Sequence, residues 1–145
     1  MEHSENPVMV LSEDDSWELV AGVSMGRLVT RVGDVVDVVP INFVVDGGTL
    51  VFRTAPGAKL SGLTVNHSVV FEVDSFDEVG GWSVVLRGTA HALETEAEVA
   101  AAEALPLRPW VPTLKTVFVR IDVESVSGRQ FRFGEEPRRE DVQEG

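Results

Sequence analysis

The sequence predicts a mainly β fold, a closed or nearly closed antiparallel barrel with a few short helices. Three observations predict this fold. The apolar residues fall in short segments with a period of two, these segments are rich in β-branched residues, and glycine-containing hairpin turns separate them. With 145 residues, of which 43% are hydrophobic, the chain is long enough to bury one core. We find no internal repeat or low-complexity linker, so we expect a single folded domain.

The first element is a predicted short helix. Ser12 is a typical N-cap, the acidic residues 13–15 suit the positive end of a helix dipole, and Gly22 ends the segment. Beyond this helix the period changes to two. Alternation predicts strands at residues 27–32, 35–45 and 49–54, separated by the turns Gly33-Asp34 and Asp46-Gly47-Gly48.

Pro40 and the segments after residue 54 complete the set of predicted elements. Pro40 indicates an edge or a bulge in the second strand, because proline cannot donate a ladder hydrogen bond. Thr95 is expected to cap a helix that buries Val99, Ala102 and Leu105. We expect a short helix at 58–63, strands at 68–74 and 82–93, a helix at 96–105, and strands at 116–122 and 124–133.

The polar ends of the chain indicate the bounds of the domain, and the overall charge indicates which classes of partner are disfavoured. Residues 1–7 are polar and 134–145 are polar and acidic, so we predict flexible tails around a domain at 8–133. The net charge of −12 disfavours binding to nucleic acids or to anionic membrane surfaces. The absence of cysteine excludes disulfides and thiolate chemistry. Without a secretion signal or a long apolar run, we expect a cytoplasmic protein.

One segment departs from the acidic composition. Residues 47–71 contain no Asp or Glu, but they contain Arg53, Thr54 and Lys59 around a Pro-Gly turn. A strand end, a hydroxyl, two cations and the start of a helix can converge on an anion, and a phosphate fits this donor set. The alternative is a surface turn with two solvated cations.

Three further residues could line a ligand. Asn42 is a lone amide in the apolar segment Val39-Pro40-Ile41-Asn42-Phe43, and it could hydrogen-bond a heteroatom ring or simply face solvent. Trp82 and Trp110 each lie beside an irregular part of the chain, where an indole can anchor an interface or form the wall of a flat pocket. Packing in the core is an equal alternative for both tryptophans.

Other kinds of site have no support in the sequence. The three histidines, His3, His67 and His91, are scattered without metal-ligand spacing, so we expect no metal site. No dinucleotide fingerprint, phosphate-binding loop or serine-hydrolase elbow occurs, and tyrosine is absent. The sequence indicates no particular catalytic acid or base.

The order of these motifs resembles the pyridoxamine 5′-phosphate oxidase-like, FMN-binding split-barrel superfamily, in particular its short bacterial members related to nitroimidazole-resistance proteins. The resemblance covers roughly residues 11–131. It is carried by Gly26-Arg27-Leu28, Pro40-Ile41-Asn42-Phe43, Phe52-Arg53-Thr54-Ala55, Gly57-Ala58-Lys59-Leu60, Val69-Val70-Phe71-Glu72-Val73, Gly81-Trp82-Ser83-Val84, Arg87-Gly88 and Pro109-Trp110.

The resemblance implies a split-barrel homodimer with FMN at the subunit interface and a small-molecule substrate. Its FMN-binding positions correspond here to Pro40, Ile41 and Asn42 beside the ring, to Arg53, Thr54, Ala55, Lys59 and Leu60 around the phosphate, and to Ser83, with Trp82 and Trp110 bordering the ring.

The sequence also departs from the pyridoxamine phosphate oxidases proper. Their Arg-x-His pair near the C-terminus is missing, because the comparable stretch is Gly128-Arg129-Gln130-Phe131-Arg132-Phe133. Oxidation of pyridoxamine phosphate is therefore not expected. Some relatives carry a deazaflavin or haem in place of FMN. Two readings stay open beside the flavin-dependent oxidoreductase: a non-catalytic protein that binds or senses a flavin, deazaflavin or haem, and a structural homodimer with a vestigial pocket.

Overall fold

The computed structural model describes residues 6–55, 67–107 and 117–138. Within these ranges it contains seven strands and two helices. They are β1 (Val8–Leu11), α1 (Glu13–Ala21), β2 (Met25–Val32), β3 (Val35–Asp46), β4 (Thr49–Thr54), β5 (Ser68–Phe76), β6 (Gly80–Ala92), α3 (Glu96–Glu103) and β7 (Val117–Arg132). The predicted mainly β, antiparallel split-barrel fold is confirmed.

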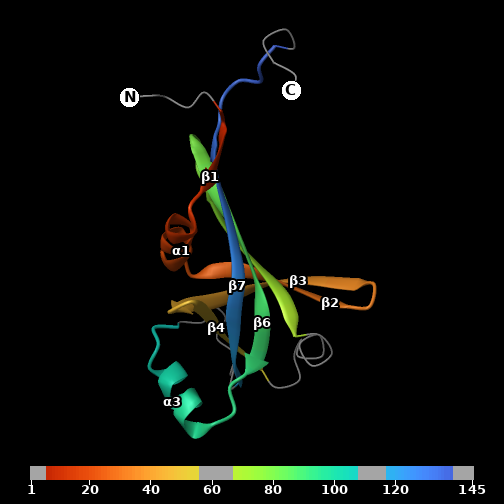
Figure 1. Cartoon of the computed structure of the whole chain (residues 1–145), viewed down its shortest axis with the longest axis vertical. Coiled ribbons are helices and arrows are strands. Elements are labelled where there is room, and N and C mark those ends of the chain that lie inside the picture. Colours follow the sequence, from red (N-terminus) through yellow and green to blue (C-terminus); the bar gives the residue numbers. More distant parts are fainter. Residues whose placement is uncertain (1–5, 56–66, 108–116, 139–145) are drawn as a thin grey trace.

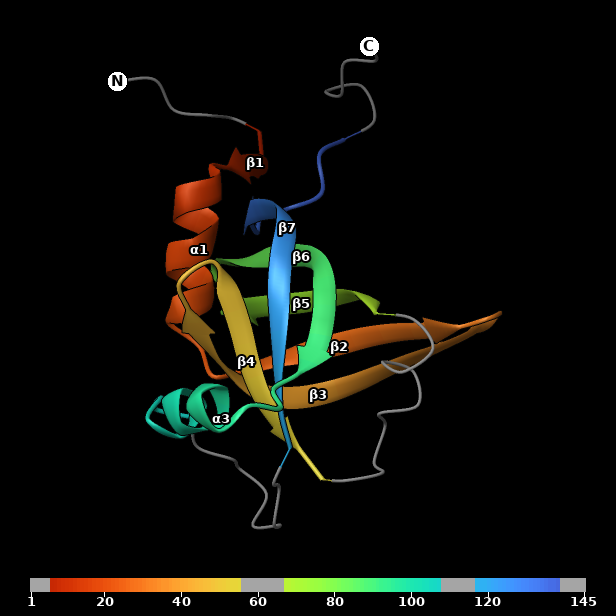
Figure 2. The same cartoon turned by 60° about the horizontal axis from the view of Figure 1, so that its bottom comes forward.

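The strands form one antiparallel sheet that closes on itself. The hydrogen-bonded order is β1-β7-β4-β3-β2-β5-β6, and β6 also pairs with β7. Six strands therefore make a ring, visible in Figure 2, and β1 is added to the far end of β7. The inward side chains of the ring fill the larger core, which includes Phe43, Phe52, Phe71, Leu86 and Ile121.

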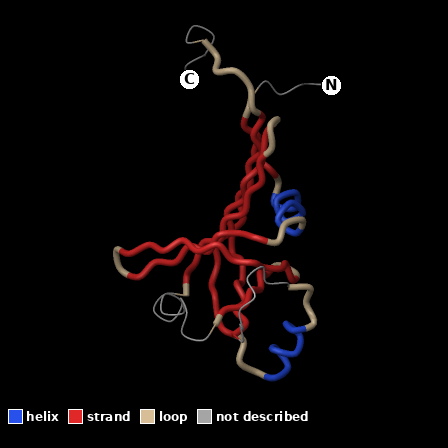
Figure 3. Tube along the Cα trace, turned by 180° about the vertical axis from the view of Figure 1, so that it is seen from behind, coloured by secondary structure: helices blue, strands red, loops and turns tan. Residues whose placement is uncertain are grey.

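Two parts of the sheet extend beyond the ring (Figures 1 and 3). The first is residues 30–38, here called the β2–β3 arm, where β2 and β3 pair with each other after the β2–β5 ladder ends at Val29. The second is the ribbon of β5, β6, β7 and β1, which runs up the long axis in Figure 1. The barrel is split because β3 also leaves β4: their ladder ends at the pair Phe43–Phe52.

Both predicted caps form as expected. Ser12 accepts a hydrogen bond from the backbone N–H of Asp15 and Gly22 follows the last turn of α1, while Thr95 and Glu98 make a reciprocal capping box on α3. Helix α3 buries Ala102 in a second, smaller cluster with Val51, Leu93 and Phe118 on the outside of the ring. Helix α1 thus adds Val20 to the larger core, whereas α3 covers the outer face of β4 and β7. Within the described residues, neither helix is long and apolar enough to cross a membrane.

Two features differ from the sequence-based expectation. The two strands expected at 116–122 and 124–133 are one continuous strand, β7, and Glu124 is an extra residue opposite the Arg87–Gly88 step of β6. This irregularity is a β-bulge rather than a turn. Strand β1, which pairs with β7, was not expected. The helix expected at 58–63 lies outside the described residues.

Candidate functional site

The segment around Pro40 lies where β3 separates from β4. The N–H of Phe43 donates to the carbonyl of Ser24 at 3.0 Å, and hydrogen-bonding residues alternate along an antiparallel strand. Pro40 and Asn42 therefore direct their backbone groups away from β2, toward the split. This register explains why a proline is tolerated in β3, and it confirms that the strand has an open edge at Pro40.

Arg53 and Thr54 end β4 on the other side of the split. They pair with Phe118 and Val117 of β7, and the Arg53 guanidinium lies 5.0 Å from the centre of the Phe118 ring. Arg53 is one residue beyond the last β3–β4 pair and Asn42 is one residue before it, so both flank the end of that ladder on the outer face of the barrel. Thr54, by alternation, faces the opposite side.

The outer face continues from Pro40 across four strands. Pro40 pairs with Arg27 of β2, Arg27 with Glu72 of β5, and Glu72 with Val85 of β6. In the adjacent row, Asp74 of β5 pairs with Ser83 of β6. Paired residues share a face, so Pro40, Asn42 and Ser83 lie on one surface. Neighbouring strands are about 4.8 Å apart, so this row spans roughly 14 Å.

Three charged side chains occupy the middle of this surface. Arg27 Nη1 donates to Glu72 Oε1 at 2.7 Å and to Asp74 Oδ2 at 2.8 Å. The Arg27 side chain is 51% exposed, whereas those of Glu72 and Asp74 are 25% and 24% exposed. Burial first, and then the hydrogen bond and the charge of Asp74, raise the pKa of Glu72 to about 7, although Arg27 acts in the opposite direction. Near neutral pH this carboxyl group is only partly ionised.

A small cavity of about 230 Å³ adjoins the cluster. It is lined by Met25, Gly26, Arg27, Pro40 and Asp74. Gly26 is buried beneath it, and a Cβ at this position would collide with the Phe71 ring. The cavity therefore brings a predicted ring-lining residue, Pro40, together with the charged groups of β2 and β5.

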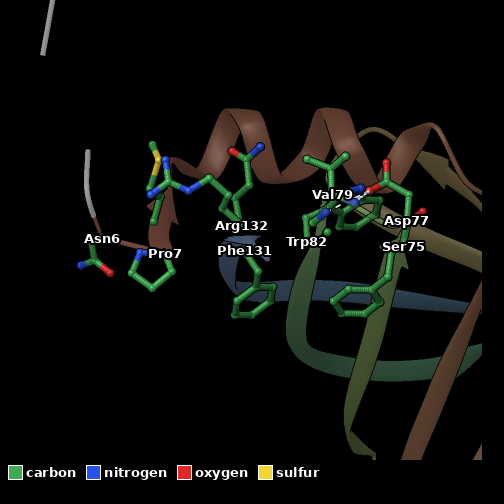
Figure 4. Close-up of a pocket in the computed structure, with 13 residues that line it drawn as sticks. Asn6, Pro7, Ser75, Asp77, Val79, Trp82, Phe131 and Arg132 are labelled. Atoms are coloured by element: carbon green, nitrogen blue, oxygen red, sulfur yellow. Dashed lines mark hydrogen bonds between the residues drawn. The ribbon is translucent and has the colours of Figure 1, made fainter. Parts of the chain in front are cut away.

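Trp82 lies on the other face of β6 from Ser83, packed against the core. It lines two cavities on the β5–β6–β7 ribbon, of about 410 Å³ and 550 Å³. Figure 4 shows the first, with Trp82, Val79, Phe131 and Arg132 around it. Asp77 accepts hydrogen bonds from the N–H groups of Val79 and Gly80, which lowers its pKa and fixes the turn beside the cavity.

The structure thus brings together some of the predicted site residues. Pro40, Asn42, Ser83 and Arg53 share the outer face, while Ile41 contacts the core from the inner face and Ala55 follows β4 directly. Trp82 points away from Ser83, so within one chain the two side chains cannot contact the same ligand face. Lys59, Leu60 and Trp110 lie outside the described residues.

The cluster of Arg27, Glu72 and Asp74 was not predicted from the sequence. The available signal was the alternation of acids at 72 and 74 in an apolar strand, which puts both on one face. The arginine that pairs with them is 45 residues away from Glu72 in the sequence, and only the β2–β5 register brings it there.

The model of the pyridoxamine 5′-phosphate oxidase family matches residues 12–130, which is most of the chain. The chain belongs to this family. The resemblance drawn from the sequence is therefore confirmed.

Solved structures agree with membership of the pyridoxamine 5′-phosphate oxidase family. A Corynebacterium glutamicum protein, provisionally named a pyridoxamine 5′-phosphate oxidase, is 44% identical, with a TM-score of 0.84 over 92% of this chain and 100% of that chain. An FAD binding protein from Mycobacterium smegmatis is 41% identical, with a TM-score of 0.76 over 86% of this chain and 98% of the other. A protein from Bacteroides thetaiotaomicron, provisionally named a 5-nitroimidazole antibiotic resistance protein, is 18% identical and shares the fold, with a TM-score of 0.75 over 90% of this chain and 95% of that chain.

Proposed function

We propose that this protein binds a flavin nucleotide on the outer face of β3, β2, β5 and β6. The observation that carries the proposal is the common face of Pro40, Asn42 and Ser83, with Arg53 beside Asn42 at the split. The 41% identical FAD binding protein supports a flavin, and it favours FAD over the FMN expected from the resemblance.

The donor set at the split fits such a ligand. At the end of β4, Arg53 offers a guanidinium for a phosphate on the outer face, and Lys59 is expected to add an ammonium group, whereas the Thr54 side chain faces the opposite side. The backbone of β3 at Asn42 is directed toward the same side, so it can hold the polar edge of a ring, while Pro40 supplies an apolar surface. The phosphate and the ring would thus be held by different strands.

We also propose that the site is completed by a second copy of the chain. Val36 and Val38 lie on the same face of β3 as Pro40 and Asn42, and both are 57% exposed. An exposed apolar arm is typical of an interaction surface. A dimer formed through this face would cover the flavin, and it would allow Trp82 or Trp110 of one chain to border the ring held by the other.

The activity that we propose is that of an oxidoreductase acting on a small molecule. A bound flavin supplies the electron transfer, and the chain supplies binding, orientation and the local electrostatic field. The residues named above would hold the ring and the phosphate of the cofactor, and the substrate would approach the face of the ring that they leave open. Retention of a flavin without turnover would identify a binding or sensing protein instead.

The test is a titration of the purified protein with FAD, FMN, a deazaflavin and haem, each followed by its absorbance. We expect saturable binding of FAD, with FMN weaker. Arg53→Met keeps a long side chain beside Phe118 but removes the charge, and it should weaken binding about tenfold or more. Arg138→Met, in the exposed segment after β7, is the matched control. Failure of both flavins to bind would overturn the proposal.

A second measurement separates the enzyme from the binding protein. The flavin-loaded protein is mixed anaerobically with a reduced nicotinamide, and bleaching of the flavin absorbance is followed. Bleaching, and recovery on adding an electron acceptor, would support the oxidoreductase. A stable spectrum with both reduced nicotinamides would favour binding or sensing.

A further inference from the structure

The cluster of Arg27, Glu72 and Asp74 lies at the centre of the proposed site. Arg27 is the direct β-sheet partner of Pro40, and Asp74 is the direct partner of Ser83. The cluster, on β2 and β5, therefore lies between Pro40 on β3 and Ser83 on β6. We propose that Arg27 is a further ligand-binding residue of the flavin cleft, and that the Glu72–Asp74 pair sets the net charge presented to the ligand. This inference rests on the proposed function.

The geometry leaves Arg27 able to bind. Both hydrogen bonds to the carboxylates use the same nitrogen, Nη1. In the part of the chain that the structure describes, Nη2 and Nε have no further hydrogen bond, and half of the side chain is exposed. Two carboxylates therefore hold the guanidinium through Nη1, and Arg27 lines the same small cavity as Pro40. A carbonyl or ring nitrogen is the chemistry that such a donor recognises.

The charge of the cluster depends on one proton. With both carboxylates ionised, two negative charges face one guanidinium, and the cluster carries a net charge of −1. When the proton is bound, the cluster is neutral. The pKa of Glu72, raised to about 7 by burial and by Asp74, places this change near neutral pH.

In the described part of the chain, the other charged side chains next to the cluster on this face are arginines. Arg87 of β6, Arg129 of β7 and Arg31 of β2 all lie on the outer face by register. None of them has an ionisation near neutral pH, because the guanidinium stays protonated. Across the row, Val85 is the direct neighbour of Glu72 on β6. Among the described residues next to Glu72, the proton on the carboxylate pair is therefore the variable charge. His91, which lies 3.4 Å from Asp122, is six residues along β6 from Val85.

The charge of FAD decides whether its affinity rises or falls when Glu72 loses its proton. FAD carries a negative diphosphate, so it binds better to the neutral cluster than to the anionic one. We expect its affinity to fall as pH rises through 7. At the distances set by the strand spacing, one additional charge changes the affinity about three- to fivefold.

The experiment measures the dissociation constant of FAD by fluorescence between about pH 6 and pH 8, below and above the titration. FAD is the probe because its diphosphate does not titrate in this range, whereas the phosphomonoester of FMN does, near pH 6. In the wild type we expect the dissociation constant to rise about three- to fivefold. Glu72→Gln should bind with a nearly constant affinity, close to the low-pH value of the wild type.

Variants of the two arginines complete the test. Arg27→Gln should weaken FAD about tenfold at every pH, and Arg138→Gln, in the exposed segment after β7, should leave it unchanged. Circular dichroism checks folding, and Arg27→Lys, which keeps the charge, is the second variant if Arg27→Gln does not fold. It should bind more weakly than the wild type because it lacks the planar donor edge.

The outcomes separate this proposal from the proposed function. If FAD and FMN fail to bind at any pH, the proposed function is wrong. If FAD binds but Glu72→Gln keeps the wild-type pH dependence, or Arg27→Gln and Arg27→Lys bind as the wild type does, the flavin site stands and the role of this cluster is refuted.

Discussion

Gly88 illustrates how one residue without a side chain can decide the packing. It lies at the bulge between β6 and β7, and a Cβ there would meet the backbone carbonyl of Asp122, which cannot move aside as a flexible side chain could. We predict that Gly88→Ala lowers the free energy of unfolding by about 1–3 kcal/mol. The control is Gly48→Ala in the β3–β4 hairpin, where a Cβ meets nothing within 4 Å. Urea denaturation measures both, and equal losses would contradict the prediction.

Glu72 also makes a testable contribution to stability. Its pKa is about 7 in the folded protein, raised from 4.5 mainly by burial, so the folded state binds this proton more tightly than the unfolded state. Stability from this group is therefore present below pH 4.5 and is lost as pH rises toward 7. Glu72→Gln, which is neutral throughout, should be more stable than the wild type at pH 8, by about 1–2 kcal/mol, and similar at low pH.

The comparison with Glu72→Gln isolates one group among 24 acidic residues. Both proteins share every other titration, so the difference between their unfolding free energies cancels the general effect of net charge. Denaturation curves at several pH values give this difference directly. A difference that is constant with pH would show that the Glu72 carboxyl group titrates alike in the folded and unfolded states.

At the scale of the element, α3 offers the sharpest prediction. Thr95 Oγ1 accepts a hydrogen bond from the N–H of Glu98, and the Glu98 carboxylate accepts one from the N–H of Thr95. Thr95→Ala should cost about 1 kcal/mol of stability, because a helix N–H loses its partner. Thr95→Ser keeps the oxygen and should cost less. Thermal unfolding compares the two, and equal effects would show that the hydroxyl does not act as a cap.

The sequence predicted those elements whose signals are local. The caps Ser12 and Thr95 lie within three residues of the groups that they bind, and Gly33 and Gly47 adopt the positive φ angles that their turns need. The bulge at Glu124 could not be predicted. A bulge requires one more residue on β7 than on β6, and this count depends on a register set by the whole barrel.

In the candidate site too, some residues have a local signal in the sequence and others do not. Pro40, Asn42 and Arg53 stand out because each interrupts a local pattern of apolar residues or of charge. Arg27 does not, because an exposed arginine in a strand is ordinary. Its importance arises only from pairing with Pro40 on one side and with Glu72 on the other. Such rows join residues that are distant in the sequence, and a single sequence contains no direct signal of register.

For the whole molecule, the central expectation is that two copies meet along the outer face of β3. The β2–β3 arm projects from the ring (Figure 1) and carries Val36 and Val38 on the face of Pro40. A chain with a net charge of −12 repels its own copies at long range, so association needs apolar contacts to offset this repulsion. The arm provides such contacts beside the proposed flavin.

The double substitution Val36→Lys and Val38→Lys tests this expectation. Both side chains are exposed, so the fold should be retained, but two buried charges would oppose the interface and raise the dimer dissociation constant at least about tenfold. Flavin affinity should fall when the dimer dissociates, because the part of the site supplied by the second chain would be missing. The control is Val79→Lys, because Val79 is 72% exposed and lies on the ribbon of β5, β6, β7 and β1, away from the arm. Sedimentation velocity gives the oligomeric state, and a wild type that is monomeric yet binds flavin would place the whole site within one chain.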